Sequence, residues 1–194
     1  MVSYSVVMDV GNSIVELLKR ELTPEPIDKP EKVGLCSPNE PEDFQLTVHL
    51  YHIEENGNYR QNDMMIENKN RMRYPPLSLK LHYLITAHSK GKGSAKSEDE
   101  GRILGRVMQC LYDHSVIESN LLQGSLKEQE EGIRIAFNQM SYDELQRIWA
   151  YPNKPYKLSL SYMVEPVLLN STRTRNVKRV TDVRVQLNQK GDFK

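Results

Sequence analysis

A change of hydrophobic period between residues 75 and 117 constrains the fold of this chain more than any other feature. In PPLSLKLHYLITAH, an apolar residue stands at almost every second position from Leu77 to Ala87. Successive side chains of a β-strand point to opposite faces, so this alternation predicts a strand over 76–87 with one apolar face. We expect the other face to be partly wet, because apart from Leu84 it is polar: Ser78, Lys80, His82 and Thr86.

A helix is predicted after the loop SKGKGSAK. In SEDEGRILGRVMQCLYDHSVI, apolar residues recur with helical spacing and form one broad stripe: Ile103, Leu104, Val107, Met108, Leu111 and Tyr112. Ser97 and Glu100 have the spacing of a capping box, and acidic residues suit the positive end of the helix dipole. The sequence therefore predicts a strand–loop–helix unit whose apolar faces pack together.

Two further helices are expected. Residues 3–22 have the pattern of an amphipathic helix, which Ser3 can cap and which Thr23-Pro24 ends. The sequence SYDELQRIWA begins with capping-box spacing at Ser141 and Glu144. Its apolar residues are predicted to point inward: Leu145, Ile148 and Trp149.

The other strands complete a predicted sheet. Alternating apolar residues favour strands over 44–53, over 133–137 and in YKLSLSYMVEPVLL, and VGLCS suggests a short strand within the acidic, proline-rich connector 23–43. Strands 44–53 and 76–87 are expected to be antiparallel neighbours, joined by a polar loop over 54–74 without sustained periodicity. These patterns predict an α/β (α+β) fold, with a mixed, mostly antiparallel sheet flanked by about three helices.

Composition divides the chain into two parts. Its 194 residues suit one domain, which we place at 1–170, and a C-terminal arm at 171–194. The formal net charge is zero, which argues against bulk attraction to nucleic acid or membranes. The arm, however, has seven Lys or Arg against two Asp, a net of +5, which leaves −5 on the remainder. Val183, Val185 and Leu187 alternate in it, so it is either a final strand with a frayed end or a strand that joins a partner's sheet.

The two cysteines, Cys36 and Cys110, lie on segments of different type, which favours a reducing compartment over a disulfide framework. The N-terminus lacks the pattern of a signal peptide, and no apolar run approaches the roughly 20 residues that span a bilayer. We therefore expect a protein made and used in the cytosol.

The sequence has no motif whose spacing indicates a catalytic, phosphate-binding or metal-binding site. The loop over 89–97 precedes a helix, as a phosphate cradle does, but it lacks the spacing of a P-loop. His82 is predicted to neighbour His49 on the paired strand, without a third metal ligand at a suitable spacing. No nucleophile elbow is present, and neither cysteine has a context that would activate a thiolate. We therefore expect no catalytic residue, cofactor or metal; the alternative is a small cytosolic enzyme that binds phosphate or a nucleotide with the 89–97 loop.

Six stretches in one order resemble a known family. They are the N-terminal amphipathic helix, FQLTVHLYHIEENGNYRQN, PPLSLKLHYLITAH, ILGRVMQCLYDHSVI, SYDELQRIWA and YKLSLSYMVEPVLL. Together they are similar to the N-terminal domain of the cap, or tail-terminator, proteins of extracellular contractile injection systems of the antifeeding-prophage and virulence-cassette type. The resemblance runs from about residue 2 to 169.

The resemblance implies a structural role. Such a protein is expected to form a homo-hexameric ring that ends growth of the inner tube and engages the last sheath ring, so its partners are the inner-tube and sheath proteins. It would assemble in the bacterial cytoplasm and then leave as part of an extracellular particle. We expect the loop 54–74 and the arm to supply partner contacts through basic residues: Arg60, Arg71, Arg73, Arg173, Arg175, Lys178 and Arg179.

Overall fold

The computed structural model describes residues 4–60, 62–128, 132–150 and 155–176. They fall into two units. The larger unit holds the chain up to residue 61 together with 76–170, and the smaller unit joins 62–75 to residues from 171 onward. The smaller unit thus brings part of the predicted loop together with the beginning of the predicted arm.

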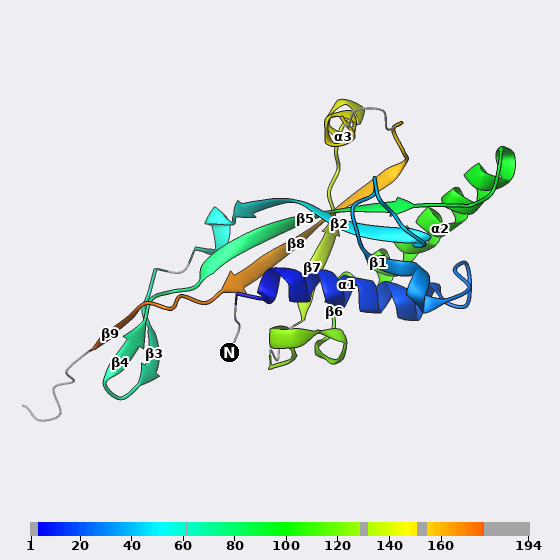
Figure 1. Cartoon of the computed structure of the whole chain (residues 1–194). Coiled ribbons are helices and arrows are strands. Elements are labelled where there is room, and N and C mark those ends of the chain that lie inside the picture. Colours follow the sequence, from blue (N-terminus) through cyan, green and yellow to red (C-terminus); the bar gives the residue numbers. More distant parts are fainter. Residues whose placement is uncertain (1–3, 61, 129–131, 151–154, 177–194) are drawn as a thin grey trace, which may run out of the picture. The chain divides into compact units, whose positions relative to one another are not determined.

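A mixed six-stranded sheet forms the body of the larger unit (Figure 1). In spatial order its strands are β1 (Val33–Leu35), β2 (Leu46–Glu55), β5 (Leu77–Ala87), β8 (Ser159–Leu169), β7 (Ile133–Phe137) and β6 (Val116–Ile117). Only β1 and β2 pair in parallel, and the other neighbours are antiparallel. The predicted fold class is confirmed, and so is the antiparallel pairing of the two strands that flank the loop.

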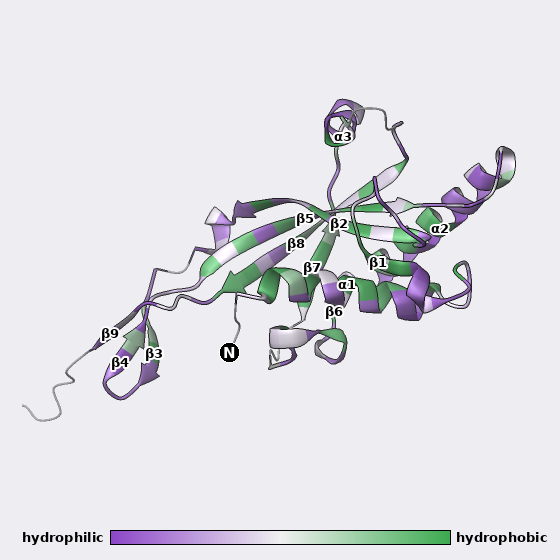
Figure 2. Cartoon of the chain, in the orientation of Figure 1, coloured by the Kyte–Doolittle hydropathy of each residue, from purple (hydrophilic) through white to green (hydrophobic). Residues whose placement is uncertain are grey.

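Two long helices, α1 (Val6–Leu22) and α2 (Ser94–Asp113), contact each other and the sheet. The hydrophobic core lies between them and the strands, and α1, α2 and each of the six strands contribute residues to it. Hydrophobic residues concentrate on the strands and α1, whereas the first turns of α2 are hydrophilic (Figure 2). Short 3-10 helices connect the elements: η1 (Pro30–Lys32), η2 (Gly57–Tyr59), η3 (Ser119–Leu121) and η4 (Gly124–Glu128).

A buried carboxylate on α1 holds η4 in place. Asp9 Oδ2 accepts hydrogen bonds from the Ser125 N–H at 3.0 Å, from Ser125 Oγ at 2.6 Å and from Ser5 Oγ at 2.8 Å. Burial acts to raise the pKa of Asp9, but the hydrogen bonds from Ser125 and Ser5 outweigh it and the pKa is lowered. Gly124 adopts φ of 58°, and a Cβ there would overlap the Asp9 carboxyl group, so this contact requires glycine.

Strand β5 is buried on both faces, so the prediction of a partly wet face is wrong. Ser78, His82, Leu84 and Thr86 are all buried, and Lys80 is half-buried. The reason is the central position of β5 between β2 and β8, whose polar side chains lie beside those of β5 and hydrogen-bond to them. Thr86 Oγ1, for example, hydrogen-bonds Ser159 Oγ across the strands at 2.8 Å.

The N-terminus of α2 differs from the prediction. The helix begins at Ser94 after Gly93, which has φ of 59°, so Ser97 lies inside it and does not cap it. Glu100 instead accepts a hydrogen bond from the Ser89 N–H at 3.2 Å. The predicted apolar stripe is also too wide, since Met108 is 45% exposed and Tyr112 is 84% exposed.

The other helices follow the sequence more closely. Helix α1 ends at Leu22 before Thr23, as predicted, while Ser3 lies outside the described residues. Helix α3 (Tyr142–Ile148) begins with the predicted capping box between Ser141 and Glu144. Of its three apolar residues, Trp149 is buried, and Leu145 and Ile148 are only half-buried.

The smaller unit is a three-stranded antiparallel sheet of β3 (Met65–Asn68), β4 (Arg71–Arg73) and β9 (Thr174–Asn176), with β4 in the middle. The prediction that 54–74 lacks regular structure is therefore wrong for its second half. The hairpin turn is closed by Asn68, whose Oδ1 accepts a hydrogen bond from the Asn70 N–H. Such a short hairpin gains stability from a third strand, and β9 supplies it.

Candidate interaction surfaces

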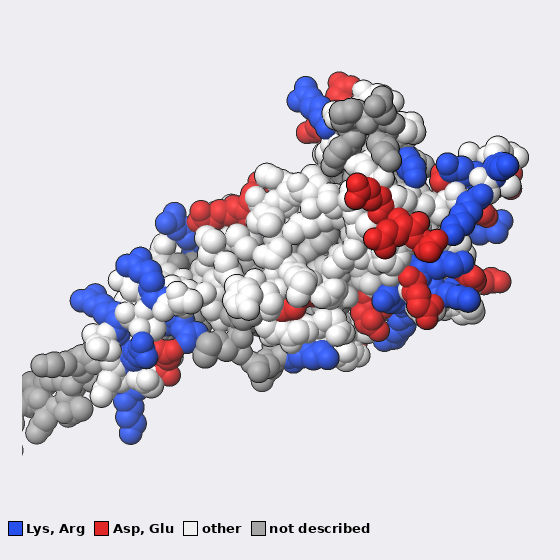
Figure 3. All heavy atoms as spheres, in the orientation of Figure 1, with Lys and Arg blue, Asp and Glu red and all other residues white. Residues whose placement is uncertain are grey.

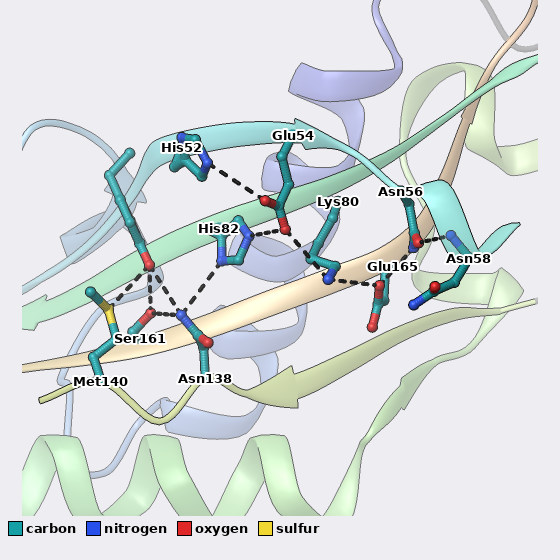
Figure 4. A network of polar contacts seen from close by, with 11 residues as sticks. His52, Glu54, Asn56, Asn58, Lys80, His82, Asn138, Met140, Ser161 and Glu165 are labelled. Atoms are coloured by element: carbon teal, nitrogen blue, oxygen red, sulfur yellow. Dashed lines mark hydrogen bonds and ion pairs between the residues drawn. The ribbon is translucent and has the colours of Figure 1, made fainter. Parts of the chain in front are cut away.

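A network of charged and polar side chains crosses β2, β5 and β8 on the larger unit (Figure 4). Lys80 Nζ lies 3.4 Å from Glu54 Oε1 and 3.4 Å from Glu165 Oε2, so it bridges the two carboxylates. Glu54 Oε1 is also 3.3 Å from His82 Nε2, and Asn56 Nδ2 donates to Glu165 Oε2 at 2.6 Å. Neighbouring strands are thus tied together by alternating charge.

An irregularity in the strand register brings these groups together. Between Leu50 and His52 the pairing of β2 with β5 shifts, so that His52 lies opposite His82 and Glu54 lies opposite Lys80. The prediction that His49 neighbours His82 is therefore wrong: His49 pairs with Leu84, and the rings of His52 and His82 are 5.4 Å apart.

The pKa values of Glu54 and Lys80 are both shifted in the direction that favours the charged form. The hydrogen bond with His82 is the main cause that lowers the pKa of Glu54, and the bond with Lys80 adds to it. Burial acts to lower the pKa of Lys80, but the charge of Glu165 and hydrogen bonds to both carboxylates outweigh it and raise the pKa. Within the described residues, no group of three or more His, Cys, Asp or Glu side chains is placed to hold a metal ion. The ammonium of Lys80 lies between the carboxylates of Glu54 and Glu165.

Neutral polar groups extend the network toward the end of β7. Tyr51 Oη lies 2.9 Å from Ser161 Oγ and 3.2 Å from Met140 Sδ. Asn138 Nδ2 donates to Tyr51 Oη and to Ser161 Oγ. These bonds join β2 and β8 to the segment after β7 and satisfy polar groups that are buried or half-buried.

Sequence reasoning missed this network. Lys80 and His82 stand on the polar side of a predicted strand, which is a signal for a polar cluster. Their partners Glu54, Asn138 and Glu165 are 26 or more residues away in the sequence, and only the strand register shows that they meet.

Four of the predicted partner-binding residues come together in the smaller unit, where Lys and Arg gather in Figure 3. Arg71 and Arg73 both form ion pairs with Glu67, and Arg71 Nε donates to Thr174 Oγ1 at 2.9 Å. Arg173 stacks over the Tyr74 ring at 4.2 Å, and Arg175 is exposed.

The remaining predicted residues lie elsewhere. Arg60 is exposed and directly follows η2 in the larger unit. Lys178 and Arg179 lie outside the described residues. Partner binding by all seven basic residues stays a prediction.

The 89–97 loop is occupied by carboxylates of the same chain. Ser89 donates from its N–H to Glu100 Oε1 and from its Oγ to Asp99 Oδ2, and Lys90 Nζ pairs with Asp43 Oδ1 at 3.0 Å. Donors that would face a phosphate thus face acidic groups, whose charge opposes a bound anion. This arrangement gives the phosphate-binding alternative no support.

Neither thiol is activated. Burial is the main cause that raises the pKa of Cys110 to about 12, and burial together with the charge of Glu42 raises that of Cys36. Both cysteines are free thiols. A raised thiol pKa leaves little thiolate at neutral pH, so these groups are poor nucleophiles.

Apolar grooves lie toward opposite edges of the large sheet. One, of about 830 Å³, lies between α2 and β7 and includes Met108, Tyr112 and Phe137. The other, of about 540 Å³, lies between α1 and β1–β2 and includes Met8 and Leu35. All five side chains are between 38% and 84% exposed, so both grooves have apolar walls open to solvent. Exposed apolar surface of this kind is typical of interaction sites.

The sheet edge beside the first groove is incompletely paired. Strand β6 covers only Ile133 and Arg134 of β7, and the Ile135 N–H bonds Ser115. Because the Asn138 N–H donates to Ser161, Phe137 forms a non-hydrogen-bonded pair with Tyr162, and its backbone groups point away from β8. Such an edge can accept another strand.

The described residues thus form an α+β fold with a partly buried polar network, open apolar grooves and a small basic sheet. Among them, no helix combines the length and hydrophobicity needed to cross a membrane. Residues 9–182 match the family model described as the Pvc16 N-terminal domain. The chain belongs to this family.

Solved structures share the fold. The sheath/tube terminator of the extracellular contractile injection system PVC, in its extended state, has a TM-score of 0.66 at 18% identity, over 96% of this chain and 65% of that one. The tube-terminating cap of the anti-feeding prophage has a TM-score of 0.63 at 20% identity, over 93% and 61%. The chain therefore spans less than two thirds of the length of either protein. No curated protein matches the sequence.

Proposed function

We propose that this protein is the structural cap of a phage-tail-like contractile injection particle, where a ring of its copies ends the inner tube and engages the last sheath ring. The observation that carries this proposal is the terminator fold, which extends over 96% of the chain. The family match over residues 9–182 supports it independently of the coordinates.

A terminator needs two different surfaces. One must complement the end of the tube, and the other must be unable to bind a further ring, so that open-ended stacking becomes a closed assembly. The open grooves and the unpaired edge of β7 supply apolar and backbone contacts suited to neighbouring subunits. The network of Lys80, Glu54 and Glu165 joins strands of the sheet that carries both grooves.

We propose that the smaller unit contacts partners through its basic residues. Arg60, Lys178 and Arg179 are proposed to contact partners as well. The ring is proposed to be a homo-hexamer that binds the inner-tube and sheath proteins. We propose that the chain acts without a catalytic group, cofactor or metal, assembles in the bacterial cytoplasm and leaves with the released particle. We also propose the division into a domain at 1–170 and a basic arm at 171–194 as functional parts.

Electron microscopy of particles made without this protein tests the proposal. A cap is expected to set the length, so its loss should give tubes and sheaths of uncontrolled length. Re-expression of the protein from a plasmid is the control and should restore a narrow length distribution. Particles of normal length in the deletion strain would contradict the proposal.

A further inference from the structure

The basic residues of the smaller unit divide into two sets on opposite faces of its sheet. Arg71 and Arg73 lie on one face, where both form ion pairs with Glu67 of the same hairpin. Within the part of the chain that the structure describes, the side chains of Arg173 and Arg175 form no ion pair with a carboxylate. Their positive charge is therefore available to a partner.

Apolar side chains share the face that carries the unpaired arginines. The register places Ile66 opposite Met72 and Met72 opposite Arg175, so the three lie in a row across the sheet. Ile66 is 65% exposed and Met72 is half-buried. Arg173, two residues before Arg175, lies on the same side. We call Ile66, Met72, Arg173 and Arg175 the basic face.

The larger unit carries a surface of opposite charge and similar character. Glu40 and Glu42 are exposed and, within the described residues, form no ion pair. They surround Cys36, because Cys36 Sγ donates to the Glu40 carbonyl at 2.8 Å and both carboxylates help to raise its pKa. Cys36 shares the α1–β1 groove with Leu35 and Met8. We call Met8, Leu35, Glu40 and Glu42 the acidic surface.

We infer that the basic face of one copy docks on the acidic surface of the next copy in the proposed ring. The two surfaces match in charge, arginine against glutamate, and each places its charges beside exposed apolar side chains. Because they are different surfaces of the same chain, their contact is heterologous, and heterologous contacts generate a ring when the rotation between neighbouring copies closes. This inference rests on the proposed function, since it names the contact that joins neighbouring caps.

Charge reversal and mixing test the contact. The acid variant replaces the glutamates of the acidic surface, Glu40→Lys/Glu42→Lys. The basic variant replaces the arginines of the basic face, Arg173→Glu/Arg175→Glu. A third protein, the fourfold variant, combines all four changes. Sedimentation velocity at low ionic strength measures association of the full chain, because the Debye length is then on the order of 30 Å and surface charges act strongly. Each double variant should associate on the order of a hundredfold more weakly than wild type, since like charges then face each other.

Mixing restores attraction only if the two surfaces meet between copies. An equimolar mixture of the acid and basic variants should form oligomers that contain both, and the fourfold variant should associate like wild type. The matched control for the basic variant is Lys92→Glu/Arg147→Glu. It makes the same charge change as the basic variant, at exposed residues outside both surfaces, and should leave association unchanged. Circular dichroism confirms that each variant is folded.

Several results would overturn the inference. One is a wild type that stays monomeric at about 100 μM, where contacts of micromolar affinity are populated. The others are double variants that associate as strongly as wild type, and a fourfold variant that stays monomeric. Particle length separates this outcome from failure of the proposed function. If deletion of the protein abolishes length control while both double variants preserve it, the cap function stands and the proposed contact does not.

Discussion

Replacement of Asp9 by alanine removes the only charged group that joins α1 to η4 within the described residues. Asp9 is 4% exposed, and its carboxylate accepts three hydrogen bonds, of which two come from Ser125 and one from Ser5. The substitution also leaves a small void beside Gly124, whose backbone lies against the carboxyl group. We therefore expect Asp9→Ala to loosen the 124–128 segment and to lower the free energy of unfolding.

The magnitude follows from the groups that lose their acceptor. A buried donor left unsatisfied costs about 1 to 3 kcal/mol, and the Ser125 N–H, whose bond to Asp9 is only partly buried, should cost about 1 to 2 kcal/mol. The hydroxyls of Ser5 and Ser125 are half-buried and can turn toward water, so each loses about 0.5 to 1 kcal/mol. Asp9→Ala should therefore destabilise the protein by about 2 to 4 kcal/mol, and Asp9→Asn, which keeps one acceptor oxygen, by about half of that.

Urea unfolding measures the effect. With a slope of about 2 to 3 kcal/mol/M for a protein of this size, the midpoint should fall by about 1 M for Asp9→Ala while the slope stays unchanged. Hydrogen exchange at the Ser125 amide should accelerate, because its acceptor is lost. A midpoint shift below about 0.2 M would refute the reasoning, since it corresponds to under about 0.6 kcal/mol.

The pH dependence of the free energy of unfolding tests the role of the Asp9 charge. The pKa of Asp9 is lower in the folded protein than the ordinary value of about 3.9 in the unfolded chain. Its contribution to stability is therefore fully present above about pH 4 and is lost as pH falls through the folded pKa. The difference in stability between wild type and Asp9→Asn should shrink toward acid pH. A difference that stays constant or grows in acid contradicts the assigned role of the charge.

Two further substitutions test separate contacts. Gly34→Ala places a Cβ against the ring of Phe44, so the ring must move; thermal unfolding should show a loss of about 1 to 3 kcal/mol, and an unchanged midpoint would contradict this packing. Glu67→Ala removes the ion-pair partner of both Arg71 and Arg73. Amides of the β3–β4 hairpin should then exchange severalfold faster while those of β5 stay protected, because exposed ion pairs contribute only about 0.2 to 1 kcal/mol each; equal exchange in both proteins would show that Glu67 does not hold the hairpin.

The local patterns that the sequence predicted well are those decided by neighbouring residues. Strand β5 follows from its period of two, and the capping box of α3 follows from the chemistry of Ser141 and Glu144. Helix α1 ends where Thr23-Pro24 breaks the helical pattern. In each case the signal lies within a few residues, so no distant partner is needed to interpret it.

Other features depended on partners that are remote in the sequence. Residues 65–73 have no periodicity that marks a hairpin, and their pairing with β9 joins segments about a hundred residues apart. Met108 and Tyr112 fit the helical stripe of α2, but the sheet does not extend far enough to cover them. The division of the arginines between Glu67 and an open face likewise depends on the register of three strands.

The sequence by itself determined the order and type of the main elements, the α+β class and the absence of a recognisable reactive motif, because these depend on hydrophobic period and local spacing. The tertiary structure alone decided which faces are covered, which charges pair and which edges stay open. A strand pattern states that one face is apolar, but the register and the neighbouring strands determine what each side chain meets. The network around Lys80 and the two faces of the small sheet exist only through that pairing.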